Sequence, residues 1–381
     1  MIYFDNASST VPTKECLDIF YKTSLEAFSN TNSIHSLGMK NFNDLIKVKE
    51  DILASLNLNK DYEVIFTSGA TESNNLAIRG YALKNRNRGN KLITTKIEHE
   101  SVLNVFKELE NEGFKVTYLD VNSEGKIDLE NFKKVIDKET ILVSIMPINN
   151  EVGNILNVKE IQSVIKDYPK CVLHCDCAQT LGKLDFDYKL TDMATISGHK
   201  IYGIKGVGAL IKKKKIMLKP IVEGGGQENG LRSGTIDYPA IKSFQYSIKN
   251  VLKEYRENLK NIEDLQGFLI NELENIDGIK LNLFGKSSPF IVNFSFEKKK
   301  ASVIVEALSN RQIYVSSLSA CNSKKHEPSH VLLAFGRTSD EASNAIRISL
   351  CTKNTMEEGK EFIKNLKEIM QEIKDRWNIT L

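Results

Sequence analysis

Cysteine is scarce in this sequence, and no long hydrophobic run is present. The six cysteines are irregularly spaced, so we expect free thiols in a reducing cytoplasm rather than a disulfide framework. No apolar run reaches the roughly 18 residues that a membrane-spanning helix needs. The N-terminus, Met-Ile-Tyr-Phe-Asp, has neither the basic nor the apolar region of a secretory signal. The sequence therefore predicts a cytoplasmic protein with no membrane partner.

Neither sign of charge dominates the composition. Lysine and arginine number 52 against 49 acidic residues, which gives a formal net charge of +3. So small an excess does not support nucleic acid as a direct partner. We interpret two lysine clusters, at 212–215 and 298–300, as solvated turns. Docking of an acidic protein or of tRNA at these clusters is the less favoured alternative.

Short apolar segments alternate with helical patterns through the first two thirds of the chain, beginning at EVIFT and ending at GVGALI. This alternation is typical of βαβ units, so it predicts an α/β fold with a mainly parallel sheet and helices on both faces. After Pro239 the pattern changes to a long helix, from about 241 to 276, and then to mixed strands and helices. We predict a large domain over residues 14–255 and a smaller α+β domain made of residues 1–13 and 256–381.

The segment Ser197-Gly198-His199-Lys200 places a lysine between the apolar run MATIS and a glycine-rich turn. A lysine in such a place is poorly solvated, which lowers its pKa and frees the amine as a nucleophile. That suits a lysine that binds pyridoxal 5'-phosphate (PLP) as a Schiff base. The alternative is a surface lysine in a turn.

Other polar groups follow other predicted strands. Asp176 ends CVLHCD, His99 follows KLITT, and Asn150 follows ILVSIMPI, so all three are expected at the carboxyl edge of the sheet, where ligands bind. A carboxylate there can keep a pyridine nitrogen protonated, and a histidine can stack on a planar ring or move protons. For Asp176, a simple helix cap is an equal alternative when the residue is taken alone.

The turn TSGATES, at residues 67–73, joins a predicted strand to a helix. Backbone N–H groups and hydroxyls at a helix N-terminus can bind a phosphate, although such turns also serve as ordinary caps. No lysine follows the glycine, so this is not a Walker motif. A metal site at His174 and Cys171, Cys175 and Cys177 is disfavoured, because ligands so close together on one strand cannot converge tetrahedrally.

Two further residues are unusual for their surroundings. Cys321 lies in a long polar segment followed by Lys324, Lys325 and His326, which would favour its thiolate and a nucleophilic role. An incidental free thiol is the alternative. Arg347 lies inside the apolar strand AIRISL, and a buried arginine needs a partner, such as a substrate carboxylate.

The chain resembles class I cysteine desulfurases of the NifS/IscS type, a branch of the class V aminotransferase superfamily with PLP fold type I. The matching segments run nearly end to end: YFDNASST, FTSGATESNNLAIRG, TKIEH, HCDCAQTLGK, SGHKIYGIKGVGAL, GGGQENGLRSGT, SACNS and AIRISL. The resemblance implies a large domain with a seven-stranded, mainly parallel sheet and a smaller domain that carries the catalytic cysteine loop.

The resemblance also implies a role for each matching residue. Lys200 would bind PLP covalently, Asp176 would pair with its pyridine nitrogen, and Gln179 would bond its ring hydroxyl oxygen. His99 would stack on the ring and assist proton transfer. The residues expected at the cofactor phosphate are Ala70, Thr71, Ser197, His199 and, from the second subunit of a homodimer, Thr235.

For the substrate, the resemblance implies that Asn30 and Arg347 hold the carboxylate of L-cysteine and that Asn150 lies near cofactor and substrate. Cys321 would accept the sulfur as a persulfide while L-alanine leaves, and an iron–sulfur scaffold or a tRNA sulfurtransferase would receive it. No metal site is expected, apart from a transient iron–sulfur contact at Cys321. Selenocysteine lyase, or a related C–S lyase on the same fold, is the alternative function.

The chain departs from the family pattern at several positions. Leu318 replaces a usual glycine before the Ser-Ala-Cys core, and Asn229 replaces a usual arginine in the glycine-rich loop. The segment after Cys321 is more basic than usual. These departures leave the PLP chemistry intact but weaken any prediction of the sulfur acceptor.

Overall fold

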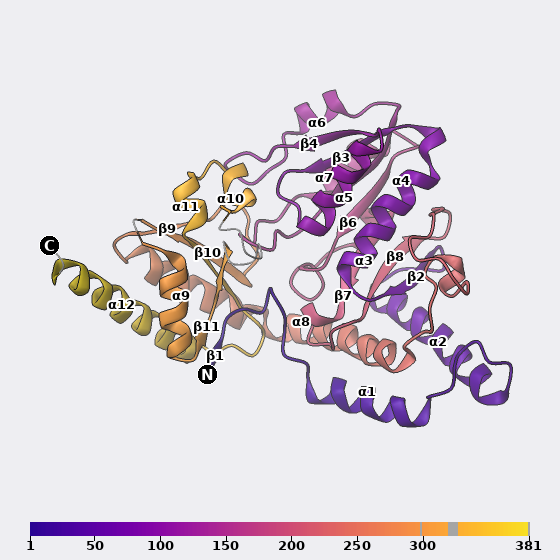
Figure 1. Cartoon of the computed structure of the whole chain (residues 1–381), viewed down its shortest axis with the longest axis horizontal. Helices are drawn as coiled ribbons and strands as arrows, with labels where there is room; N and C mark the ends of the chain where they lie inside the picture. The colour runs from indigo at the N-terminus through magenta and orange to yellow at the C-terminus, as the bar shows by residue number, and fades with distance from the viewer. Residues whose placement is uncertain (298, 319–326, 380–381) are drawn as a thin grey trace.

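The computed structural model describes residues 1–297, 299–318 and 327–379, with side chains up to residue 375 (Figure 1). Cys321 and the basic residues after it therefore lie outside the described residues. Within the described part, no helix is both long enough and apolar enough to cross a membrane.

Seven strands form the central sheet, in the order β2-β8-β7-β6-β5-β3-β4. β8 runs antiparallel to both neighbours, and the other adjacent strands are parallel, which confirms the prediction of a seven-stranded, mainly parallel sheet. The strands are β2 (Tyr62–Thr67), β3 (Lys91–Thr95), β4 (Lys115–Leu119), β5 (Thr140–Ile145), β6 (Val172–Asp176), β7 (Met193–Ser197) and β8 (Gly208–Lys213).

Both faces of this sheet are covered, because alternate strand residues point to opposite sides. In β2, Ile65 packs in one hydrophobic cluster while Val64 and Phe66 pack in another. The first cluster includes residues of α4 (Tyr81–Lys84), α5 (Glu100–Asn111) and the helical stretch that begins with α3 (Ala70–Asn75). The second includes residues of α2 (Ser36–Ser55), α6 (Leu129–Val135), α7 (Val158–Ile165) and the first half of α8 (Tyr238–Glu274).

A smaller antiparallel sheet gathers on the other side of the molecule, with the order β12-β13-β10-β9 (Figure 1). β1 (Ile2–Tyr3) lies beside it and pairs in parallel with β11 (Ile313–Tyr314). The remaining strands and helices are β9 (Ile279–Leu281), β10 (Ile291–Phe296), β12 (Ser316–Ser317), β13 (Ala345–Ser349), α9 (Ala301–Asn310), α10 (His330–Ala334), α11 (Ser339–Ser343) and α12 (Met356–Ile379).

α8 joins the two parts. Its first half buries residues such as Phe244 in the cluster of the large sheet, and its second half buries residues such as Leu269 in a separate cluster with Phe4 and Phe362. The predicted domain boundary at residues 255–256 falls within this helix. The division into two domains stays a prediction.

The first helix, α1 (Lys14–Glu26), begins after Thr13, whose hydroxyl accepts from the Cys16 N–H and caps the helix. Its apolar side chains, however, are largely uncovered. Leu17, Tyr21 and Leu25 are 46–69% exposed, and Phe28, just after the helix, is 74% exposed. Phe42 and Ile46 of α2 are exposed as well, so the two helices present an apolar surface to the outside.

Candidate active site

A cavity of about 660 Å³ opens at the carboxyl ends of the parallel strands. Nine of the predicted site residues line it, although they come from distant parts of the chain: Ala70, Thr71, His99, Asn150, Asp176, Gln179, His199, Lys200 and Arg347. The sheet edge thus brings together what the sequence predicted it would. Asn30 and Thr235 are exposed and are not among the described residues that line the cavity.

Asp176 is the last residue of β6 and is 5% exposed. One carboxylate oxygen accepts from Asn74 Nδ2 (2.9 Å) and the other from the Ala178 N–H (3.1 Å). Asn74 also donates to Ser101 Oγ, so its amide is tied to two neighbours. These donors fix a carboxylate at the cavity wall, and Asn74 is a site residue that the sequence reasoning missed. The sequence gives no signal for this role, because the burial of Asn74 within α3 is visible only in the structure.

Lys200 ends a short 3₁₀ turn, Gly198–Lys200, that follows β7. Its Nζ donates to the backbone carbonyls of Ala7 (2.6 Å) and Ser8 (2.8 Å). The N-terminal segment therefore crosses the cavity next to the predicted cofactor lysine. Thr10 continues this contact, since its N–H and its hydroxyl both donate to the His199 carbonyl.

His199 lines the cavity and lies 3.1 Å (Nδ1) from the Ser197 hydroxyl. Burial and, to a smaller extent, the nearby Lys200 and Lys205 together lower the pKa of His199 to about 4. Its imidazole is thus neutral at pH 7 and offers hydrogen bonds rather than a positive charge.

His99 caps α5 at the edge of the cavity. Its Nδ1 accepts from the Ser101 N–H (3.1 Å). Because Nδ1 is an acceptor, the proton of the neutral ring sits on Nε2. The cap thus fixes both the place of the ring and its tautomer.

The turn of residues 67–73 leads from β2 into α3 and lines the cavity with Ser68, Ala70 and Thr71. A Cβ on Gly208 would lie 2.7 Å from the Cα of Gly69, so β8 can run beside this turn only with glycine at 208. Glu72 accepts from the Ser68 N–H (2.7 Å) and from Arg232 Nε (2.8 Å). Burial opposes ionisation of Glu72, but these donors outweigh it and hold its pKa below the ordinary value.

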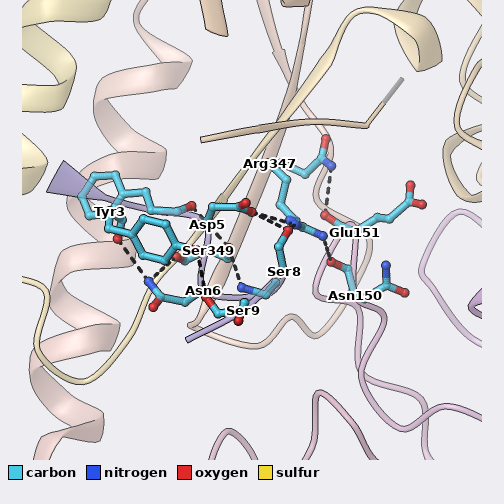
Figure 2. Close-up of polar contacts among 12 residues, drawn as sticks. Tyr3, Asp5, Asn6, Ser8, Ser9, Asn150, Glu151, Arg347 and Ser349 are labelled. Carbon is cyan, nitrogen blue, oxygen red and sulfur yellow. Dashed lines mark hydrogen bonds and ion pairs between the residues drawn. The ribbon is translucent and has the colours of Figure 1, made fainter. Parts of the chain in front are cut away.

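Arg347 lies on β13 and is 3% exposed (Figure 2). Its Nη2 donates to Asp5 Oδ1 (2.9 Å) and Ser8 Oγ (2.7 Å), and its Nη1 donates to the Asn150 carbonyl (2.9 Å). Nε has no hydrogen-bond partner among the described residues. The sequence indicated that a buried arginine needs a partner. Within the chain that partner is Asp5, which was not predicted from the sequence.

Glu98 is fully buried next to His99. Oε1 accepts from the Thr95 hydroxyl (2.7 Å) and the Met146 N–H (3.1 Å), while Oε2 has no hydrogen-bond partner among the described residues. Burial raises the pKa of Glu98 to about 8 against the effect of these two donors. The carboxyl is therefore mainly protonated at pH 7, and no role for Glu98 was predicted from the sequence.

His174 is also fully buried, and both ring nitrogens face hydroxyl groups, Ser144 at 2.8 Å and Thr195 at 3.0 Å. Burial lowers its pKa to about 3. This histidine therefore serves the core of the sheet. Among the described residues, no group of three or more His, Cys, Asp and Glu side chains could hold a metal ion.

The residues present fit PLP. The cavity combines a lysine amine for the aldehyde carbon, a fixed buried carboxylate for the pyridine nitrogen, and a hydroxyl- and N–H-rich turn for the phosphate. These three groups serve three different parts of one cofactor, and they lie around one cavity.

Comparison with known proteins agrees with this geometry. Residues 2–362 match the family described as Aminotransferase class-V. The chain belongs to this family. A NifS/IcsS protein homolog of Lactobacillus delbrueckii subsp. bulgaricus is 39% identical, with 97% of each chain covered. The cysteine desulfurase IscS of Clostridium botulinum strain Kyoto is 37% identical, with 97% of this chain and 94% of that protein covered.

Solved structures of the family superpose closely as well. A NifS-like protein has a TM-score of 0.90 at 36% identity, covering 97% of this chain and 99% of that one. SspA in complex with cysteine has a TM-score of 0.78 at 34% identity, covering 92% and 99%. The predictions of family, fold, PLP dependence and cysteine desulfurase function are confirmed at this level. The roles of individual residues stay predictions.

Proposed function

We propose that this chain removes the sulfur of L-cysteine, releases L-alanine and leaves a persulfide on Cys321. One observation carries the proposal: Lys200, Asp176, Gln179 and Arg347 all line a single cavity. PLP, when bound, supplies an electron sink for a carbanion at the substrate Cα. The other steps belong to residues of this chain.

Arg347 is the group that binds the substrate carboxylate in this proposal. Its guanidinium is held by Asp5, Ser8 and the Asn150 carbonyl, and these contacts leave one Nη1 hydrogen as a donor. A planar guanidinium with a fixed orientation can recognise a carboxylate and so orient the whole substrate. Asp5 partly neutralises the positive charge around Arg347. The site should therefore prefer a zwitterionic amino acid to one with an additional negative charge.

Two residues move protons. The Lys200 amine would take the proton from the substrate Cα, and the Ala7 and Ser8 carbonyls, which accept from its Nζ, would keep the amine in place. His99 presents a protonated Nε2, because its Nδ1 is occupied by the Ser101 N–H. In this proposal His99 uses that N–H to assist proton transfer beside the bound cofactor.

The sulfur step balances without another reagent. The Cys321 thiolate attacks the substrate sulfur, so an S–S bond forms as the Cβ–S bond breaks. The electron pair of the broken bond stays with the carbon skeleton, which takes up a proton and leaves as L-alanine. The products are L-alanine and the Cys321 persulfide.

We also propose that two copies of the chain form the working enzyme. The exposed apolar surface of α1 and α2 supports this, because a surface of that kind is buried in stable oligomers. Thr235, which is not among the described residues that line the cavity of its own chain, would serve the second subunit. The sulfur acceptor would be an iron–sulfur scaffold or a tRNA sulfurtransferase in the cytoplasm. The five described cysteines are free, which suits a reducing compartment.

A Lys200→Ala variant tests the cofactor assignment. We expect it to lose the visible absorption band of covalently bound PLP and to lose sulfide release from L-cysteine. Lys214→Ala, which changes an exposed lysine outside the cavity, is the matched control and should keep both. A Lys200→Ala protein with the wild-type band would contradict the proposal.

A further inference from the structure

Lys183 is a buried cation next to the cofactor cavity. It is 6% exposed and does not line the cavity itself. Its Nζ donates to Oε1 of Gln179 (2.6 Å), which does line the cavity. No carboxylate forms an ion pair with Lys183 in the part of the chain that the structure describes. A buried, unneutralised ammonium is costly, so its place calls for an explanation.

The turn after β6 fixes this lysine in position. The Lys183 N–H donates to the Thr180 carbonyl (3.0 Å). Gly182 has a φ of +73°, and a Cβ there would lie 2.3 Å from a methyl group of Val251 on α8. The glycine lets α8 pack directly against the turn, which confines Lys183 to the space beside Gln179.

The contacts of Gln179 show what Lys183 does. The amide oxygen is occupied by the ammonium, and Nε2 donates to the Ala7 carbonyl (2.8 Å). If the amide rotated by half a turn, its oxygen would face the carbonyl oxygen of Ala7 and its NH₂ would face the ammonium. Both contacts would be repulsive, so the amide has one orientation. Nε2 carries a second hydrogen, which this orientation leaves as a donor.

We propose that Lys183 is a positioning residue for the cofactor: it holds the Gln179 amide so that its remaining N–H donates to the ring oxygen of PLP, and its charge strengthens that donor. The inference rests on the proposed role of Gln179 at the ring oxygen. Lys183 reaches the cofactor only through Gln179, because it does not line the cavity and its Nζ donates to Gln179 Oε1.

Charged groups around Lys183 tune this effect. Burial lowers the pKa of Lys183, Lys200 and Arg347 lower it as well, and Cys351 acts in the opposite direction. Together these effects bring the pKa to about 7. The charge of Lys183 therefore changes close to neutral pH. When it is present, this charge strengthens the remaining Gln179 N–H as a donor, and that donor favours the unprotonated form of the bound cofactor.

Spectrophotometric pH titration of the holoenzyme tests the proposal. Removal of the charge in Lys183→Met should make the cofactor easier to protonate, so the midpoint of its visible spectral change should move to higher pH by on the order of 1 unit. Lys183→Gln keeps a donor to Gln179 without the charge, and its midpoint should lie between those of Lys183→Met and the wild type. Lys189→Met, at an exposed lysine of the same region, should leave the midpoint unchanged.

The Gln179→Ala variant shows whether a negative result concerns Gln179 or only Lys183. In Gln179→Ala the midpoint should shift, and adding Lys183→Met should change it no further, because Lys183 acts through Gln179. If Gln179→Ala leaves the midpoint unchanged, the proposed role of Gln179 is wrong and this inference fails with it. If Gln179→Ala shifts the midpoint but neither Lys183 variant does, or if the two changes add fully, only the inference about Lys183 is overturned.

Discussion

The carboxylate of Asp5 and the guanidinium of Arg347 meet at the cavity wall, with Oδ1 2.9 Å from Nη2, although the two residues are 342 positions apart in the sequence (Figure 2). Their side chains are 24% and 4% exposed, so solvent screens the pair only in part. Through this pair, and through the Ala7 and Ser8 carbonyls at Lys200, the N-terminal segment belongs to the active site as fully as the strand ends do.

Arg347→Lys should weaken substrate binding. A lysine keeps the charge but loses the planar fork that Asp5, Ser8 and the Asn150 carbonyl orient. We expect the KM for L-cysteine to rise about tenfold or more, equivalent to about 1.4 kcal/mol, with a smaller change in kcat. Steady-state kinetics measure this. Arg311→Lys, which changes an arginine paired with Glu368 and Glu372 away from the cavity, is the control. Equal KM values for Arg347→Lys and the wild type would remove Arg347 from the substrate site.

Glu98→Gln should change how stability depends on pH. The pKa of Glu98 rises from 4.5 in the unfolded chain to about 8 in the folded one, so the folded state binds the extra proton and loses stability as pH rises through this window. Between pH 5 and pH 7 this loss is about 2.5 kcal/mol. A glutamine stays neutral at both pH values. The free energy of unfolding of the variant, measured by urea unfolding at pH 5 and pH 7, should therefore lack this loss. Glu100→Gln, at the exposed neighbour, should behave as the wild type does.

His174→Gln should act in the opposite direction. The pKa of His174 falls from 6.5 to about 3 on folding, so the unfolded chain binds the extra proton and stability falls as pH falls below 6.5. Between pH 7 and pH 5 this costs about 2 kcal/mol. Between pH 7 and pH 5, the free energy of unfolding of His174→Gln should therefore fall by about 2 kcal/mol less than that of the wild type. An identical pH dependence in both proteins would mean that His174 is not held neutral by burial.

Phe28→Glu tests the proposed homodimer. Phe28 is 74% exposed beside α1, and a charge there would be desolvated in an interface. We expect sedimentation or light scattering to show a shift from dimer to monomer. Val303→Glu places the same charge at a 50% exposed position on α9 and should leave the dimer intact. A monomeric wild-type protein would contradict the proposal outright.

The cavity residues that end strands could be predicted from the sequence, because strand patterns are local and parallel strands present their carboxyl ends together. Asp176, His99 and Lys200 were found in this way. The pairing of Asp5 with Arg347 could not be, since it depends on how the N-terminal segment crosses a sheet formed hundreds of residues later. The roles of Glu98 and Lys183 could not be predicted for a related reason. Their pKa values depend on burial, and a charged residue in a polar motif is normally expected to be exposed.

Leu318 is one of the departures from the family pattern noted in the sequence. The leucine stands where the resemblance predicts a glycine before Cys321. It is 5% exposed and packs in the large hydrophobic cluster with Val331 and Leu332. Leucine at this position therefore adds a buried apolar side chain to the core that glycine would not provide.

The central claim, that this chain transfers sulfur from L-cysteine to Cys321, is tested most directly by mass spectrometry of the holoenzyme after incubation with L-cysteine. The account predicts one added sulfur atom on the peptide that contains Cys321, with L-alanine released in equal amount. It also predicts that Cys321→Ser keeps the PLP absorption band and forms no persulfide. Added sulfur on a different cysteine, or sulfide release by Cys321→Ser at the wild-type rate, would contradict the account.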